Sequence, residues 1–345
     1  MTIAPRLLEW FDRNGRKNLP WQQDISPYRV WVSEIMLQQT QVQTVIPYYH
    51  RFMQALPTVQ DLAAASEDAV MHLWTGLGYY SRARNLRRSA QIICSEFGGE
   101  FPNDVERLSE LPGVGRSTAG AIVSIAFQRR AAILDGNVKR VLARVHAVDG
   151  YPGVTSVARE LWERAEQHTP EVRVADYTQA IMDLGATLCS RTKPACGICP
   201  LVDDCQAHEL GTIAQFPGKK PPKVLPVKRT QMLMIGNSAQ ELLLEKRPPT
   251  GIWSGLWIFP QADAGADPIA YCSDQLGIEV ELLERWREYR HTFSHYHLDI
   301  EPVRLRLKHA PPTVMEPERH LWYNLRAPAA VGLAAPVAKL LEKLA

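Results

Sequence analysis

The sequence predicts a multidomain protein in which an all-α domain over residues 1–210 precedes an α+β domain over residues 228–345. Three observations predict this division. Apolar residues recur at helical spacing in the first part, a proline-rich linker covers residues 211–227, and alternating apolar residues typical of strands follow it. A chain of 345 residues is long enough for two domains, each with its own core.

The helical domain is predicted from apolar residues that repeat every three to four positions. Turn signals rich in proline and glycine separate the helical segments. The segments with helical spacing are Leu7–Phe11, Val30–Ile46, Asp61–Leu73 and Val138–Val148.

The pattern of apolar residues changes after the linker. The prolines of the linker cannot continue a helix and favour an extended backbone. Met232–Ile235 and Leu242–Leu244 are short apolar runs on either side of a polar turn, which predicts two strands. Alternation over Tyr296–Leu307 predicts a longer strand, and a helix is expected from about Pro336 to Leu344.

Charge and composition restrict the location of the protein and its partners. The net charge is only +2, so binding to nucleic acid would depend on local clusters of basic residues. No apolar stretch is long enough for a membrane helix, and the N-terminus lacks the pattern of a signal peptide. We expect a cytoplasmic protein with no membrane partner. The candidate basic residues, which could equally lie on solvated helix faces, are Arg82, Arg84, Arg87, Arg88, Lys139, Arg140 and Arg144.

Four of the six cysteines lie close together, with the spacing Cys189-x6-Cys196-x2-Cys199-x5-Cys205. Clustering in a large chain favours a metal site over a disulfide framework. Structural zinc usually uses two short Cys-x2–4-Cys hooks, whereas this segment has one short hook flanked by longer arms. Four unequally spaced thiolates suit a [4Fe–4S] cluster, with zinc as the alternative.

A glycine-rich turn lies within Leu111–Ile122 and is followed by a predicted helix that starts near Ser117. Gly113 and Gly115 allow a tight turn and leave no side chain between the backbone and a ligand. The free N–H groups of a helix N-terminus bind anions, so the turn could hold a DNA phosphate without regard to base sequence. A plain corner between two helices is the alternative.

Two carboxylates are candidate catalytic groups. Glu34 lies in a largely apolar helical segment, where burial would raise its pKa toward that of a general acid at neutral pH. Helical spacing places Glu34, Gln38 and Gln41 on one face, which could also be a solvent-facing stripe. Asp135 stands between an apolar run and a helix, a position typical of a helix cap that can also fix a catalytic carboxylate.

These motifs, in this order, resemble adenine DNA glycosylases, the A/G-specific branch of the helix–hairpin–helix and endonuclease III superfamily. The resemblance covers residues 5–210 and, more weakly, the rest. It rests on the segment around Glu34, on Leu73–Tyr80, on the hairpin, on Ile133–Arg140 and on the four cysteines.

The resemblance implies a base-removal reaction and assigns roles to individual residues. Glu34 would protonate N7 of adenine, and Asp135 would stabilise the oxocarbenium charge that develops on the deoxyribose. Gln39 and Tyr79 would fill the gap left by a flipped base, and Trp21 and Gln22 would line the adenine pocket. The DNA contacts would also include Gly113, Gly115 and Asn137. The cysteines would hold a [4Fe–4S] cluster that is chiefly structural.

The position of Ser117 indicates base removal without strand cleavage. Related enzymes that also cut the backbone carry a lysine just after the hairpin, whose amine forms a Schiff base. Ser117 occupies that position, and no lysine lies between Arg51 and Lys139. Ser117 is therefore counted with the active-site residues, and a role as helix N-cap is the alternative or an addition.

The C-terminal part resembles a Nudix-type domain. Thr250–Pro260 is similar to the start of the Nudix signature, but Gln261–Gly277 contains none of the glutamates that hold Mg²⁺ in Nudix hydrolases. The resemblance implies a domain that recognises 8-oxoguanine through the loop His291–His297, with Ser294 in direct contact and Phe293 and His295 in support. An ordinary strand end with surface histidines is the alternative.

The sequence therefore predicts a monomeric enzyme that excises adenine paired with 8-oxoguanine or guanine in duplex DNA, acting on the nucleoid of a bacterial-type cell. Three alternatives remain at this point: a glycosylase for thymine or oxidised pyrimidines, a non-catalytic iron–sulfur protein that binds DNA, and a nucleotide pyrophosphatase. The absent lysine argues against the first alternative, Glu34 and Asp135 against the second, and the missing glutamates against the third.

Overall fold

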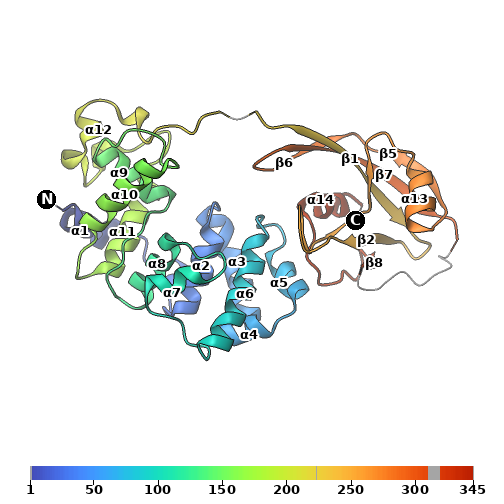
Figure 1. The fold of residues 1–345 in the computed structure, drawn as a ribbon, viewed down its shortest axis with the longest axis horizontal. Coiled ribbons are helices and arrows are strands. Elements are labelled where there is room, and N and C mark those ends of the chain that lie inside the picture. The colour runs from blue at the N-terminus through green and yellow to red at the C-terminus, as the bar shows by residue number, and fades with distance from the viewer. Residues whose placement is uncertain (1, 223, 310–318, 345) are drawn as a thin grey trace. The chain divides into compact units, whose positions relative to one another are not determined.

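A computed structural model describes residues 2–222, 224–309 and 319–344. Within these residues, no helix is both long enough and apolar enough to cross a membrane. Figure 1 shows helices over the N-terminal part of the chain and a sheet over the C-terminal part.

The contacts divide the chain into two units. The first comprises Met1–Ala64 and Asn85–Pro222, and the second comprises Ala65–Arg84 and Lys223–Ala345. Helix α6 (Ser81–Glu96) contributes residues to both units.

The first unit is helical. Its remaining α-helices are α1 (Ala4–Asn14), α2 (Pro27–Leu37), α3 (Val42–Ala55), α4 (Val59–Ala64), α7 (Val105–Glu110), α8 (Arg116–Ala126), α9 (Gly136–Val145), α10 (Thr155–His168), α11 (Val174–Thr187) and α12 (Gln206–Glu209). Short 3-10 helices cover Pro20–Gln22, Cys196–Ile198, Val202–Asp204 and Ile213–Gln215.

Two segments predicted from their periodicity as single helices are each broken into two. The chain leaves α2 at Leu37 and enters α3 at Val42, and Gln39 between them has a left-handed backbone with φ of 57°. Helix α4 likewise ends at Ala64, and Ser66 starts a new helix by accepting a hydrogen bond from the amide of Ala69 at 3.2 Å. Periodicity reports which residues of a segment are buried and does not register a short break between two successive helices.

One core of the first unit lies among α1, α9, α10 and α11, which are neighbours in Figure 1. Phe11, Leu142, Leu161 and Leu184 contribute one apolar side chain from each of these helices, and all four are buried. Helix α8 packs against α2, α7 and α11, so the hairpin helix connects the helix of Glu34 to this core.

The second unit contains a mixed sheet together with helices α5 (Glu67–Trp74), α13 (Pro268–Leu276) and α14 (Ala335–Leu344). The strands are β1 (Val227–Gly236), β2 (Glu241–Lys246), β3 (Trp257–Ile258), β4 (Gln261–Asp263), β5 (Val280–Arg285), β6 (Tyr289–Thr292), β7 (His297–Leu307) and β8 (His320–Asn324). The path through the sheet is β3-β2-β1-β7-β5, while β4 pairs with β1, β6 with β7 and β8 with β2. The β1–β7 pair is parallel and the others are antiparallel.

Strand β7 shifts its buried face along its length. Leu298 and Ile300 are buried in its first half, and Val303 and Leu305 in its second half. Side chains two apart share a face of a strand, so these two pairs lie on opposite faces of the sheet. Val303 and Leu305 join a core that includes Cys272 of α13, which explains why the predicted alternation changes its parity along the strand.

The segment Ala65–Arg84 is held to the C-terminal part of its own unit by polar contacts. Asp68 forms an ion pair with Lys246 at 2.8 Å and accepts a hydrogen bond from Nε1 of Trp257 at 3.3 Å. The hydroxyl of Tyr80 donates to the carbonyl of Leu333 at 2.9 Å. Residues distant in sequence therefore build one unit.

Candidate active site

Glu34 lies on α2 between buried apolar neighbours, and its own side chain is only partly exposed. Burial, and to a smaller extent the charge of Asp135, raise the pKa of Glu34 to about 8. The two carboxyl groups are therefore electrostatically coupled, although 101 positions separate them in the sequence. Such a pair tends to hold one proton and one negative charge at neutral pH.

Asp135 is the N-cap of α9, as its position in the sequence predicts. Its Oδ1 accepts a hydrogen bond from the amide of Val138 at 2.7 Å. Burial raises the pKa of Asp135, while the backbone amides of Val138 and Asn137 and the charge of Arg140 lower it. A carboxylate at a helix N-terminus is fixed in place and faces the positive end of the helix dipole.

Ser117 does not cap a helix. Helix α8 begins at Arg116 with Gly115 as its N-cap residue, so the alternative role proposed for the serine is wrong. The Ser117 hydroxyl instead accepts a hydrogen bond from the amide of Leu134 at 2.9 Å. This bond ties the hairpin helix to the residue directly before Asp135, which sequence spacing could not show.

The glycine turn between α7 and α8 has the geometry of an exposed backbone loop. Gly113 has φ of 79°, and a Cβ atom there would lie 2.9 Å from Cβ of Asn85. A Cβ atom at Gly115 would meet no atom within 4 Å, and Gly113, Gly115 and Arg116 are exposed. The exposed turn and the helix N-terminus form a surface suited to an anion.

The glutamines near Glu34 are arranged differently from the prediction. Gln38 and Gln41 lie beyond the end of α2, so they do not share a helical face with Glu34. Gln38 donates from Nε2 to Oγ1 of Thr118 at 3.5 Å, whereas Gln39 is exposed on the left-handed turn. A left-handed backbone is uncommon for residues other than glycine and often marks a functional position.

Tyr79 belongs to the second unit and is 52% exposed, with φ of 47°. The guanidinium of Arg82 lies 5.6 Å from the Tyr79 ring centroid and 5.4 Å from that of Trp74. Arg82 itself is buried, so the exposed tyrosine rests on a fixed cationic support.

Trp21 and Gln22 form the short 3-10 helix that precedes α2. Trp21 is buried and contacts the ring of Tyr49 edge to face at 5.5 Å. The Gln22 amide accepts from the backbone N–H of Leu19 at 3.0 Å and donates to the carbonyl of Arg16 at 2.9 Å. Gln22 therefore fastens the loop in which it lies.

The sequence reading missed the ion pair between Asp183 and Arg16. Asp183 is fully buried on α11 and accepts hydrogen bonds from the backbone amide, Nε and Nη2 of Arg16 at 2.8, 3.0 and 2.6 Å. Because Arg16 also accepts from Gln22, the pair anchors the loop of Trp21 and Gln22 to α11. The sequence could have indicated this pair, because Asp183 is an acidic residue within an apolar helical segment, which is the same feature that identified Glu34.

Asn137 lies at the start of α9, and its Oδ1 accepts from Nη2 of Arg140 at 2.8 Å. The same guanidinium donates to the carbonyls of Gly185 and Cys189, each at 2.7 Å. The helix capped by Asp135 is thereby connected to the end of α11 and to the cysteine segment.

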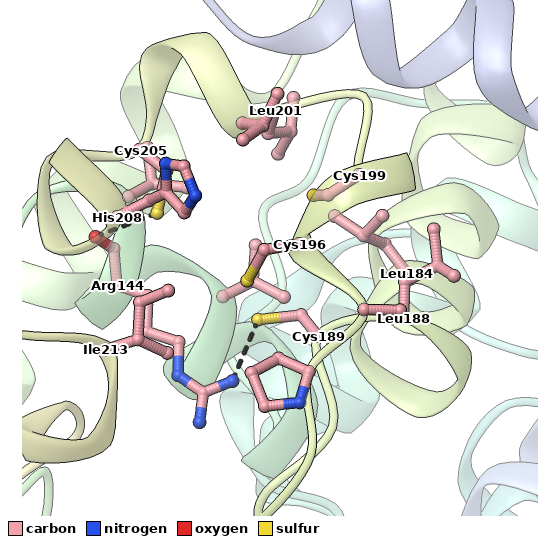
Figure 2. A pocket seen from close by; sticks show the side chains of 15 residues that line it. Arg144, Leu184, Leu188, Cys189, Cys196, Cys199, Leu201, Cys205, His208 and Ile213 are labelled. Carbon is pink, nitrogen blue, oxygen red and sulfur yellow. Dashed lines mark hydrogen bonds between the residues drawn. The ribbon is translucent and has the colours of Figure 1, made fainter. Parts of the chain in front are cut away.

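The four clustered cysteines line one cavity, which Figure 2 shows together with Arg144 and apolar neighbours. Buried Arg144 donates to Sγ of Cys189 at 3.2 Å, and Sγ of Cys205 lies 3.4 Å from the carbonyl of Arg144. Burial raises the pKa of Cys199 to about 11, and the neighbouring cysteines act in the same direction. Among the described residues, no three His, Cys, Asp or Glu side chains form a preassembled metal-ligand set.

The loop between β6 and β7 carries the predicted recognition residues. The amide of Phe293 donates to the carbonyl of Tyr296 at 2.9 Å, which closes a tight turn with Ser294 and His295 exposed at its tip. The Phe293 ring packs against Tyr296 and, unexpectedly from the sequence, against Trp253 of another loop.

Comparisons with known proteins establish the family. Residues 32–167 match the HhH-GPD superfamily of base excision DNA repair proteins, and residues 231–343 match a NUDIX domain. An adenine DNA glycosylase of Buchnera aphidicola subsp. Acyrthosiphon pisum is 38% identical, over 97% of this chain and 95% of the relative. The human adenine DNA glycosylase is 37% identical, over 92% of this chain and 69% of the relative. The chain belongs to the adenine DNA glycosylase family.

Solved structures of other DNA glycosylases share the fold of part of the chain. A thermostable thymine-DNA glycosylase matches with a TM-score of 0.53 and 27% identity, over 60% of this chain and 95% of that chain. An endonuclease III–DNA complex matches with a TM-score of 0.52 and 23% identity, over 60% and 94%, and shows the shared fold. The predicted fold class, a helix–hairpin–helix glycosylase domain with a Nudix-like C-terminal domain, is confirmed, and the protein is a DNA glycosylase of base excision repair.

Proposed function

We propose that this enzyme hydrolyses the N-glycosidic bond of adenine paired with 8-oxoguanine or guanine in duplex DNA. The observation that carries the proposal is the coupled pair of Glu34 and Asp135, in which burial and a neighbouring charge raise the pKa of Glu34 to about 8. A binding protein needs no such pair, whereas adenine excision needs an acid and an anion together.

In this mechanism Glu34 is the general acid. Adenine is a poor leaving group as an anion, and a proton transferred from the Glu34 carboxyl to N7 allows it to depart as a neutral base. A pKa of about 8 keeps the carboxyl group protonated at neutral pH. After departure of the base, the Glu34 carboxylate accepts a proton from the water that attacks the sugar.

Asp135 supplies the negative charge that stabilises the oxocarbenium ion formed when the glycosidic bond breaks. Its carboxylate is held by the amide of Val138 at the N-terminus of α9. A charge already in position needs no reorganisation during the reaction, which is the basis of electrostatic stabilisation. The hydrogen bond from Leu134 to Ser117 supports this position.

Ser117 also supports base removal without strand cleavage. A hydroxyl cannot form the imine that cleaves the backbone, and this hydroxyl is already engaged by a backbone amide. We propose that lyase activity is weak or absent.

The DNA contacts follow from the exposed backbone and side chains. The amides around Gly113 and Gly115 and the residue Asn137 would hold phosphates, while the adenine pocket would be bordered by Trp21 and Gln22. Gln39 and Tyr79, both exposed with left-handed backbones, would fill the gap that the flipped adenine leaves in the duplex.

The C-terminal domain would read the base opposite adenine. Ser294 and His295 are exposed at the tip of a closed turn, and Phe293 supports them from within an aromatic cluster. With no glutamate between Gln261 and Gly277, the segment has lost the acids that Nudix hydrolysis requires. Recognition of 8-oxoguanine therefore fits this domain better than pyrophosphate hydrolysis.

The cysteine cavity suits an iron–sulfur cluster. Cys189, Cys196, Cys199 and Cys205 line one cavity among apolar side chains, and thiolates buried there need a positive centre to balance their charge. A [4Fe–4S] cluster held by these residues would brace the segment structurally. Through Arg140 and Arg144, the chain's own contacts tie this segment to α9, the helix capped by Asp135.

For the whole chain we propose a glycosylase domain over residues 1–210, a linker over 211–227 and a recognition domain over 228–345. The enzyme would act as a monomer on the nucleoid.

A single-turnover assay tests the proposal with duplexes that place A opposite 8-oxoguanine, A opposite G, T opposite G, and thymine glycol opposite A. We expect excision of adenine alone, visible as strand breaks only after hot alkali. Glu34→Gln should lower the rate at least about 100-fold, the range for loss of a general acid. Strand breaks without alkali would contradict the Ser117 argument, and unchanged excision by Glu34→Gln would contradict the mechanism.

A further inference from the structure

The loop from Thr250 to Gly255 resembles the start of a Nudix signature but is followed by no metal-binding glutamates in Gln261–Gly277. Its backbone is unusual, because Gly251, Trp253 and Gly255 all have left-handed conformations with φ of 86°, 54° and 70°. A bulky aromatic residue is rarely left-handed, and such strain persists only where the surrounding structure imposes it.

Backbone hydrogen bonds impose this conformation. The amide of Leu256 donates to the carbonyl of Trp253 at 2.9 Å, and Arg247 and Leu256 pair from amide to carbonyl at 2.9 Å. The amide of Gly255 also donates to the carbonyl of Arg247 at 3.3 Å. These bonds close the loop at its base, so the direction in which the Cα–Cβ bond of Trp253 leaves the backbone is set.

Trp253 joins the aromatic cluster of the recognition loop from a different part of the chain. Its ring centroid lies 5.3 Å from that of Phe293 and 5.8 Å from that of His291. Phe293 packs in turn against Tyr296 at 4.8 Å. Trp253 is only partly buried, so it is not a core residue whose sole function is to fill space.

The chemistry of this surface fits a nucleobase. Flat π systems stack on aromatic side chains, and the exposed Ser294 and His295 offer polar groups to the edge of a base. The ammonium group of Lys228 lies 5.0 Å from the ring centroid of Tyr296, which adds positive charge beside the cluster. Aromatic faces, polar groups and a cation together match a base and its phosphate.

We propose that Trp253 is a base-stacking residue of the recognition surface and that it contacts the nucleotide strand carrying 8-oxoguanine. The inference rests on the proposed role of the C-terminal domain and extends it to a loop outside His291–His297. The loop Thr250–Gly255, which resembles the start of the Nudix signature, would then supply an aromatic ring on which a DNA base stacks.

The test compares Trp253→Leu, Trp253→Phe and the control Trp286→Leu, each combined with Glu34→Gln so that bound adenine is not excised. Trp286 belongs to the same unit and makes no ring contact with the cluster among the described residues. Affinities are measured for duplexes with A opposite 8-oxoguanine and A opposite G. Thermal unfolding of each variant verifies that it folds.

Trp253→Leu should weaken binding to the A:8-oxoguanine duplex by roughly 5- to 150-fold, the range for loss of one stacked base, with a smaller change for A:G. Trp253→Phe, which keeps an aromatic ring, and Trp286→Leu should stay within about threefold of the parent. Trp253→Gly suits the left-handed backbone and removes the ring, so it should reproduce the loss even if the leucine variant is unstable.

Equal losses of affinity for Trp253→Leu and Trp253→Phe would overturn the stacking role, and equal losses for the two duplexes would overturn the assignment of Trp253 to the surface that recognises 8-oxoguanine. Excision assays of the enzyme with an intact Glu34 separate this failure from a failure of the proposed function. If that enzyme prefers A:8-oxoguanine and Trp253→Leu keeps the full preference, the stacking inference alone is wrong. If that enzyme removes adenine without preferring the A:8-oxoguanine duplex, the proposed recognition of 8-oxoguanine by the C-terminal domain is wrong. The inference about Trp253, which rests on that role, is then wrong as well.

Discussion

At the scale of single residues, the proposed active site depends on two carboxyl groups to which we assign opposite tasks. Glu34 lies among buried residues of α2, whereas Asp135 accepts a backbone hydrogen bond at the start of α9. Burial raises both pKa values, but the amides of Val138 and Asn137 counteract this effect at Asp135 alone. The proton of the pair therefore belongs on Glu34 and the charge on Asp135.

This difference predicts the pH dependence of adenine excision. If Glu34 is the general acid, as we propose, its pKa of about 8 means that the single-turnover rate should fall about tenfold per pH unit above that value. The rate should also fall at low pH as Asp135 becomes protonated, and the two limbs report the pair as a whole. Rates measured from pH 4 to pH 10 test this, and a rate that keeps rising above pH 9 would exclude Glu34 as the acid.

Sequence reasoning worked for residues whose signal is local. The helix cap at Asp135 and the gathering of the four cysteines around one cavity could be predicted because capping and cysteine spacing act over a few residues, while the cluster itself stays a prediction. The partnership of Asp183 with Arg16 and that of Trp253 with Phe293 could not be found, because only the folded chain brings these residues together.

At the scale of elements, the candidate site residues are positioned mainly by the short connections between helices and by contacts between neighbouring helices. The hairpin helix α8 contacts α2, and its Ser117 holds the backbone of Leu134 directly before Asp135. The break between α2 and α3, which periodicity did not reveal, presents Gln39 on an exposed left-handed turn. The periodicity thus identified which helical segments are buried. It did not show where the helices end, and the candidate site residues lie at these ends.

The hydrogen bond from Leu134 to Ser117 predicts the effect of Ser117→Ala. The substitution leaves a backbone amide without its acceptor, which should lower the free energy of unfolding by about 1–3 kcal/mol. It should also slow excision, because Asp135 is attached to the loosened segment. Urea unfolding and single-turnover rates measure the two effects, with the exposed Ser95→Ala on α6 as the matched control. Slowed excision without lost stability would instead indicate direct contact of the hydroxyl with the substrate.

At the scale of the whole molecule, the chain is not divided at a single point. The segment Ala65–Arg84 lies between helices of the first unit in the sequence, yet it packs with the C-terminal residues. Asp68 binds Lys246 and Trp257, and Tyr80 binds Leu333. The exposed Tyr79, proposed to enter the duplex, is therefore carried by the same unit as the recognition loop.

This packing predicts a strong effect of a single methyl group at Gly332. A Cβ atom there would lie 2.4 Å from Cβ of Met71, a contact that real side chains do not make, so the segment or its partner must shift. Gly332→Ala should lower the free energy of unfolding by about 1–3 kcal/mol, as overpacking of a tight contact does. Gly236→Ala on β1, where the nearest atoms are 3.9 Å away, should be nearly neutral. Both variants can be compared by urea unfolding of the full chain. If Gly332→Ala is as stable as Gly236→Ala, then Met71 and Gly332 are not packed together in solution, and the segment Ala65–Arg84 does not contact the C-terminal residues at this point.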